Sequence, residues 1–142
     1  LYSTSEEHEA FIAFKRSTES LGVGAVSELI KAVIRTMRFR DMIKLVKLAK
    51  KGGESYEDSL KKAKKPYVFV GMLVVRRKYQ GQGYMRKVLD IAYEEGKKLG
   101  CPVLLDTDAA LKRDKYVHLG MKNVRTRKFD EGIVLYDLAK ED

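Results

Sequence analysis

The hydrophobic pattern of the chain predicts short strands at its front, followed by helices. Residues 1–17 carry aromatic and β-branched side chains on either side of a polar turn at 5–8, which is typical of two short strands. Ser27 then caps a run in which apolar residues recur at helical spacing as far as Met37. A second helical run over 42–48 ends at Gly52-Gly53, and a more polar helix is predicted over 55–64.

The sequence pattern predicts strands and helices more clearly in the second part of the chain. Residues 67–75 are apolar almost throughout, as expected for a central strand that is covered on both faces. A helix is predicted over 83–99, where Gly100 ends it. The remaining predicted elements are a strand over 102–105, a short helix over 109–118 and two closing strands over 122–129 and 132–138. This order indicates a mixed α/β fold.

The turn between the strand at 67–75 and the next helix has the features of an anion site. It reads Gln80-Gly81-Gln82-Gly83 and follows three basic residues, 76–78. Glycines let the backbone approach a ligand closely, and a helix start offers unpaired N–H groups to a phosphate. No Gly-Lys-Ser/Thr follows, and a third glycine is absent, so the turn is neither a nucleotide P-loop nor a dinucleotide fingerprint. A plain strand-to-helix turn is the alternative.

The same residues resemble the central motif of the GNAT family of acetyl-CoA-dependent N-acetyltransferases. The family pattern Arg/Gln-x-x-Gly-x-Gly/Ala matches Gln80–Met85, with Met85 in place of the small residue. Leu73–Val75 is similar to the Leu-x-Val of the preceding strand, and Tyr116–Met121 resembles the family's Tyr-x-x-x-Gly-Phe element. The resemblance covers residues 66–138 well and the front of the chain loosely.

The resemblance implies a fold. Residues 1–142 are expected to form one α/β (α+β) domain, in which a mixed, mostly antiparallel central sheet is flanked by helices. Residues 66–138 would be its acetyl-CoA-binding half. The family's first strand and its helices are expected to lie upstream of Leu1 or to be absent from this chain. A bulge in the strand that contains Leu73–Val75 would separate it from the next strand and free its backbone groups.

The resemblance also implies a reaction, in which a primary amine attacks acetyl-CoA directly in a ternary complex. The backbone amide near Val74 would hold the oxyanion, and Tyr116 would protonate the departing thiolate. A tyrosine packed on the sheet, its hydroxyl bound by a carbonyl, is the alternative for Tyr116. The expected cofactor-binding residues are Leu73, Val75, Arg76, Lys78, Gln80, Gly81, Gln82, Gly83, Tyr84 and Met85.

The sequence does not identify a general base. His118 is more typical of a surface helix residue than of a base. His8 and Glu9 could line the acceptor cleft, but a polar hairpin explains them equally well. The amine acceptor also has no signature in the sequence.

Composition limits the class of protein. With 142 residues, 44% hydrophobic and 35% charged, the chain fits one soluble globular domain. One cysteine, Cys101, excludes an internal disulfide framework and a cysteine-rich metal site, so no metal is expected. No stretch is apolar enough to span a bilayer, and a cytoplasmic location is expected.

The formal net charge of +9 is compatible with several anionic partners. Residues 25–65 hold 12 basic and 5 acidic side chains, most simply as solvated helix faces. Two other function classes remain open: an acyl-CoA-binding sensor or scaffold without catalysis, and a basic nucleic-acid module. A nucleic-acid partner is not expected, because no recognised reading motif is present. Sheet edges invite dimers in this family, so a homodimer is a further expectation.

Overall fold

The computed structural model describes residues 1–19, 31, 53–129 and 132–141. The two helices predicted between Ser27 and Gly53 fall almost wholly outside the described residues. The polar helix predicted over 55–64 is present as α3 (Tyr56–Lys62).

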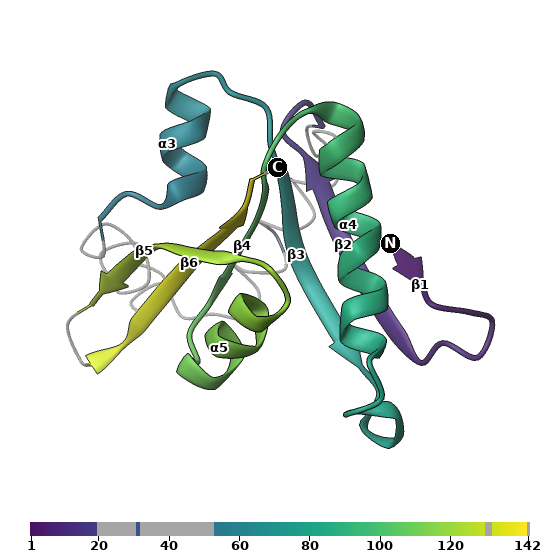
Figure 1. The fold of residues 1–142 in the computed structure, drawn as a ribbon. Coiled ribbons are helices and arrows are strands. Elements are labelled where there is room, and N and C mark those ends of the chain that lie inside the picture. The colour runs from purple at the N-terminus through teal and green to yellow at the C-terminus, as the bar shows by residue number, and fades with distance from the viewer. Residues whose placement is uncertain (20–30, 32–52, 130–131, 142) are drawn as a thin grey trace.

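The described strands form one sheet in the order β1-β2-β3-β4-β6-β5 (Figure 1). Only β3 and β4 run parallel, and the other neighbours are antiparallel. The prediction of a mixed, mostly antiparallel sheet is therefore confirmed. The strands are β1 (Tyr2–Ser3), β2 (Ala10–Arg16), β3 (Val68–Val75), β4 (Val103–Thr107), β5 (Lys122–Lys128) and β6 (Val134–Lys140).

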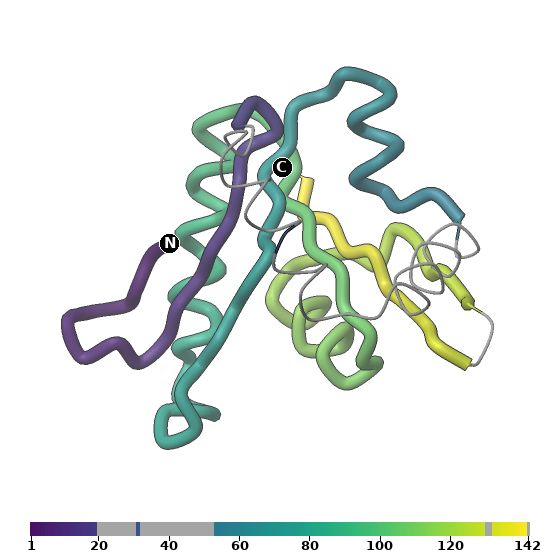
Figure 2. The backbone as a smooth tube through the Cα atoms, turned by 180° about the vertical axis from the view of Figure 1, so that it is seen from behind, coloured from purple at the N-terminus to yellow at the C-terminus, as the bar shows by residue number. Residues whose placement is uncertain are grey.

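Helices cover both faces of this sheet. The helices α4 (Tyr84–Leu99) and α5 (Ala110–His118) pack on one face, and α3 packs on the other (Figures 1 and 2). A short 3₁₀ turn, η1 (Arg77–Tyr79), precedes α4. Neighbouring β4 residues separate the two cores, because Leu105 belongs to the α4 side and Leu104 to the α3 side.

The sequence places α4 closely against the sheet. Val88, Leu89 and Ala92 recur at helical spacing and are fully buried beneath it. A Cβ atom at Gly96 would lie 2.6 Å from the Cγ2 atom of Val103, so a glycine is needed where helix and strand approach. This packing fixes the start of α4 beside the end of β3.

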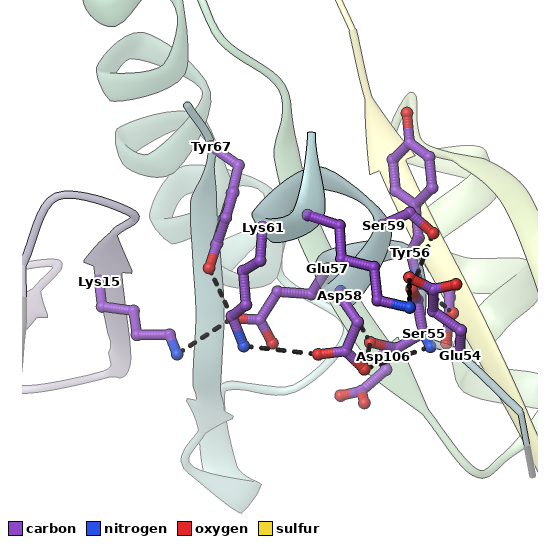
Figure 3. A network of polar contacts seen from close by, with 12 residues as sticks. Lys15, Glu54, Ser55, Tyr56, Glu57, Asp58, Ser59, Lys61, Tyr67 and Asp106 are labelled. Carbon is purple, nitrogen blue, oxygen red and sulfur yellow. Dashed lines mark hydrogen bonds and ion pairs between the residues drawn. The ribbon is translucent and has the colours of Figure 1, made fainter. Parts of the chain in front are cut away.

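A polar network surrounds the N-terminus of α3 (Figure 3). The Ser55 hydroxyl accepts a hydrogen bond from the Asp58 N–H at 3.1 Å, and the Asp58 carboxylate accepts one from the Ser55 N–H. This reciprocal capping box defines where the helix begins. One turn later, Leu60 packs against Tyr67 and Leu104.

The prediction that the whole central strand is covered on both faces is wrong for its second half. Met72 is 45% exposed and Val74 is 44% exposed. Within the described part of the chain, α3 packs near the beginning of β3, where Phe69 lies, and does not extend to these two residues. The closing strand also starts later than expected, at Val134.

Candidate functional site

The parallel pairing of β3 with β4 ends after two residue pairs. The pairs are Val68 with Val103 and Phe69 with Leu104. Beyond them, β4 continues along β6 as far as Thr107. An opening therefore lies between the carboxyl ends of two parallel neighbours, a position at which ligands often bind in α/β folds.

A β-bulge interrupts β3 beside this opening. The register with β2 shifts between Ala13 and Phe14, which leaves Gly71 as the extra residue of β3. The family resemblance implied such a bulge, and the register confirms it.

The bulge changes which neighbour the β3 backbone faces. Before it, the Val68 N–H donates to the Pro102 carbonyl at 3.0 Å, on the β4 side. After it, the Arg76 N–H donates to the Glu9 carbonyl at 2.9 Å, on the β2 side. Peptide groups alternate in direction along a strand, so counting back from Arg76 gives the direction of each amide after the bulge.

By this alternation, the peptide groups of Leu73 and Val75 face the opening, and that of Val74 faces β2. The Val75 carbonyl accepts a 3.3 Å hydrogen bond from the Gln80 side-chain amide. The Leu73 N–H and carbonyl have no partner among the described residues. The peptide group that faces the opening is therefore that of Leu73, the residue before Val74, where the backbone contact was predicted.

The glycine turn has the backbone geometry of an anion cradle. Gly81 has φ +79° and Gly83 has φ +81°, in the left-handed region that favours glycine. A Cβ atom at either position would meet no protein atom within 4 Å, so both glycines border open space. Gly83 is also the N-cap residue of α4 and makes no side-chain cap.

The amides at this helix start are free to bind a ligand. The first hydrogen bond into α4 runs from the Lys87 N–H to the Gly83 carbonyl at 3.2 Å. In the described part of the chain, the N–H groups of residues 81–86 have no acceptor. Unpaired N–H groups and the positive end of the helix dipole both favour an anion here.

The side chains around the turn add positive charge. The first turn of α4 contains no acidic residue and includes Arg86 and Lys87. The Lys87 Nζ atom lies 4.5 Å from the centre of the Tyr84 ring, and the Lys78 Nζ atom lies 4.6 Å from that of Tyr79. These ring contacts hold both cations beside the turn.

The turn, the end of β3 and α5 line one cleft with a volume of about 580 Å³. Eight of the predicted site residues line it: Leu73, Val75, Gln80, Gly81, Gly83, Tyr84, Met85 and Tyr116. The other four, Val74, Arg76, Lys78 and Gln82, are not among its lining residues. Arg76 instead donates to the Glu7 carbonyl, and the Gln82 side chain donates to the Lys78 carbonyl.

Tyr116 lies on the α5 wall of the cleft. Its side chain is packed in the main core and only 9% exposed, and this burial raises the pKa of its hydroxyl. The hydroxyl has no hydrogen-bond partner among the described residues. Its oxygen is not sealed in the core, because Tyr116 lines the cleft and no fully buried side-chain oxygen among the described residues lacks a partner. Tyr116 is therefore a neutral phenol that can donate a proton into the cleft.

Sequence reasoning missed part of the lining. Tyr79, Arg86, Lys112, Lys115 and Leu119 also face the cleft, and so does His118, which the sequence predicted to be a surface helix residue. Residues 112, 115 and 119 share one helical face with Tyr116, so a helical projection from that tyrosine would have found them. Arg86 was indicated by its place in the first turn of the helix.

The opposite face of the sheet carries carboxylates near the same opening. Asp106 follows Leu105 on β4 and points to the α3 side, where its carboxylate lies 3.4 Å from the Arg127 guanidinium. Arg127 binds the buried Asp137 more closely, at 2.8 Å. Burial raises the pKa of Asp106, and the negative charges of Asp137 and Glu57 add to the effect.

Among the described residues, no helix is long and apolar enough to cross a membrane. In the same part of the chain, no group of three or more His, Cys, Asp or Glu side chains is arranged to hold a metal ion.

Comparisons with known proteins relate the chain to acetyltransferases. The model of the acetyltransferase (GNAT) family matches residues 49–120, half of the chain. No curated protein matches. A protein from Agrobacterium tumefaciens, assigned as an acetyltransferase, is 27% identical over 54% of this chain, with a TM-score of 0.48. The chain spans only 57% of that protein.

Two solved structures cover nearly the whole chain. Arylalkylamine N-acetyltransferase 2 from Aedes aegypti has a TM-score of 0.61 and 14% identity, over 96% of this chain and 70% of that one. NAA60 from Arabidopsis thaliana, solved with acetyl-CoA, has a TM-score of 0.54 and 15% identity, over 97% of this chain and 70% of that one. At these identities, the likeness shows a shared fold.

Proposed function

The chain belongs to the acetyltransferase (GNAT) family, and we propose that it transfers an acetyl group from acetyl-CoA to a primary amine. The amine would attack the thioester directly, in a ternary complex. The observation that carries this proposal is a single cleft lined both by the glycine turn with its unpaired amides and by a tyrosine whose hydroxyl has no partner among the described residues.

The cleft has the chemistry that acetyl-CoA requires. The N–H groups of residues 81–86 and the cations of the first α4 turn suit the pyrophosphate. The apolar side chains of Leu73, Val75 and Met85 offer a wall for the pantetheine chain, and the exposed backbone of β3 offers hydrogen bonds to its amides.

Two groups of the chain would act on the thioester. The Leu73 N–H, which faces the opening without a partner, would donate to the carbonyl oxygen and stabilise its developing negative charge. The Tyr116 hydroxyl would protonate the departing thiolate. Because burial raises the pKa of this hydroxyl, it keeps its proton at neutral pH.

On the acceptor side, Asp106 would receive the proton of the amine, directly or through water. Its side chain is 45% exposed, and its one ion pair among the described residues, with Arg127, is long at 3.4 Å. Extending the pair of Phe69 with Leu104 by two residues along each parallel strand puts Asp106 level with the Gly71 bulge, beside the gap between β3 and β4. The cofactor cleft and this carboxylate lie on opposite faces of the sheet, so the two substrates would meet in the gap between β3 and β4.

The test combines binding with turnover. Isothermal titration with acetyl-CoA should show binding at one site, and a panel of primary amines should stimulate release of CoA thiol. Binding without thiol release for any amine would favour an acyl-CoA sensor or scaffold instead. Absence of acetyl-CoA binding would overturn the proposal.

A further inference from the structure

The polar turn between β1 and β2, residues 4–9, docks against the segment that leads into the glycine turn. The Arg76 N–H donates to the Glu9 carbonyl at 2.9 Å, and the Arg76 guanidinium donates to the Glu7 carbonyl at 3.0 Å. The Tyr79 hydroxyl donates to the Glu7 carboxylate at 3.3 Å. Three hydrogen bonds therefore join two segments about 70 residues apart in sequence.

The β1–β2 turn has its own internal support. The hydroxyls of Thr4 and Ser5 both donate to one carboxylate oxygen of Glu9, at 2.7 and 2.6 Å. These bonds lower the pKa of Glu9 to about 2, so its carboxylate stays ionised and keeps both partners. The Thr4 N–H also donates to the Ala10 carbonyl at 3.1 Å. The turn is thus held in shape independently of the segment that it contacts.

Tyr79 connects this turn to the anion cradle. Its ring packs edge-on against the ring of Tyr84, the first residue of α4, with 5.5 Å between ring centres. The Arg76 guanidinium lies 5.9 Å from the Tyr79 ring on the way to Glu7. A contact path therefore runs from Glu7 through Tyr79 to the helix start that carries the free amides.

We propose that the β1–β2 turn is a brace for the CoA-binding loop, and that Arg76 and Tyr79 are positioning residues that act through Glu7. This proposal rests on the proposed function, because it gives these residues a role in acetyl-CoA affinity. It assigns Arg76 to the protein rather than to a phosphate, in agreement with its absence from the cleft lining.

The brace and simple electrostatics predict opposite results for Glu7→Ala. Removing a carboxylate near an anion site makes the site more positive, so electrostatics alone would tighten acetyl-CoA binding. Glu7→Ala leaves both Arg76 hydrogen bonds, which end on backbone carbonyls, and removes the Tyr79 bond to the carboxylate. Loss of this bond leaves the loop less ordered and weakens binding, by about threefold for one exposed hydrogen bond. Glu6→Ala is the matched control, because it makes the same charge change at an exposed neighbour whose side chain has no hydrogen bond or ion pair with the described residues.

A double-mutant cycle with Tyr79→Phe separates the brace from direct ligand contact. Calorimetry should give weaker acetyl-CoA binding for Glu7→Ala and for Tyr79→Phe, with little further loss in the double variant. A thiol-release assay at saturating acetyl-CoA should give an unchanged kcat for Glu7→Ala. An effect of Tyr79→Phe with none of Glu7→Ala would mean that the hydroxyl contacts ligand, and it would overturn the brace. Equal affinities of Glu7→Ala and Glu6→Ala would overturn it too.

Hydrogen exchange tests the brace without any ligand. In the free protein, the hydrogen-bonded amides of Arg76, Tyr79 and Lys87, which flank the glycine turn, should exchange faster in Glu7→Ala and Tyr79→Phe than in wild type or Glu6→Ala. Unchanged exchange would overturn the brace. If wild type fails to bind acetyl-CoA while the exchange result holds, the proposed function fails and the brace stands.

Discussion

Substitutions at Gly83 can distinguish the two contributions, shape and charge, that the cradle would make to phosphate binding under the proposed function. Its φ of +81° lies in the region that favours glycine, and a Cβ atom there would meet no protein atom within 4 Å. A side chain at this position would therefore fill the space that we assign to the pyrophosphate. Gly83→Asp and Gly83→Asn fill nearly the same volume, and only aspartate adds a negative charge.

The cost to folding should be small and similar for both variants. A side chain at positive φ costs about 1–2 kcal/mol, and Asn and Asp tolerate this region better than other residues. For a domain of this size, such a loss lowers the melting temperature by a few degrees, at about 4 °C per kcal/mol. Far-UV circular dichroism should therefore stay native in both.

The difference in affinity should be much larger. A carboxylate about 5 Å from one phosphate charge repels it by about 1–3 kcal/mol for an effective dielectric constant between about 80 and 20. This corresponds to about 5- to 150-fold weaker acetyl-CoA binding by Gly83→Asp than by Gly83→Asn.

Calorimetric titration at two ionic strengths provides the assay. The Asp-to-Asn ratio should be largest near 10 mM salt, where the Debye length is about 30 Å, and should shrink near 1 M, where it is about 3 Å. If the two variants bind acetyl-CoA equally at low salt, the cradle does not hold a phosphate and the site has been assigned wrongly.

Three further predictions concern single side chains. Tyr116→Phe should lower kcat by about 10²-fold or more and leave acetyl-CoA affinity within about twofold, because only proton donation is lost; equal loss of both would contradict the role. Asp106 can act as a base only when it is ionised, so wild-type kcat/KM should fall as the pH decreases through the raised pKa of this carboxyl. This fall at acidic pH should be absent in Asp106→Asn; if the variant keeps it, another group is responsible. Gly96→Ala should destabilise the fold by about 1–3 kcal/mol in urea unfolding, because its Cβ would lie 2.6 Å from Val103, whereas Gly71→Ala, with open space around it, should change stability by less than about 0.5 kcal/mol.

Local signals in the sequence were sufficient to predict α4 and the turn before it. Two glycines, apolar residues at helical spacing and the stop at Gly100 lie within about 20 residues. Each of these signals determines the conformation of the backbone at its own position. Most strands and helices in the described part of the chain were predictable for the same reason. The cleft was predictable only as far as the family motifs extend, to the turn and Tyr116.

The acceptor side was not predictable from the sequence. The position of Asp106 depends on the pairing of β4 with β3 and β6, and the Glu7 contacts join residues about 70 positions apart. Nothing in the local sequence of either segment specifies such a partner. The cationic lining of α5 is an intermediate case, because it follows from helical spacing once Tyr116 is taken as a reference.

One residue of β3 determines which amides serve the cleft. In the regular part of the strand, Val68 and Val70 face the α4 side and the Val68 N–H points to β4, so an uninterrupted strand would turn the Val74 amide toward the opening. The extra residue at Gly71 reverses this alternation, and Leu73 and Val75 take that orientation instead, with their side chains against the main core. Because residues 67–75 are apolar at nearly every position, the hydrophobic pattern cannot reveal such a reversal, and Gly71 is its only signal in the sequence. The same bulge that directs the Leu73 N–H into the opening is therefore the reason why we propose the oxyanion contact at Leu73, one residue before the position that a regular strand would supply.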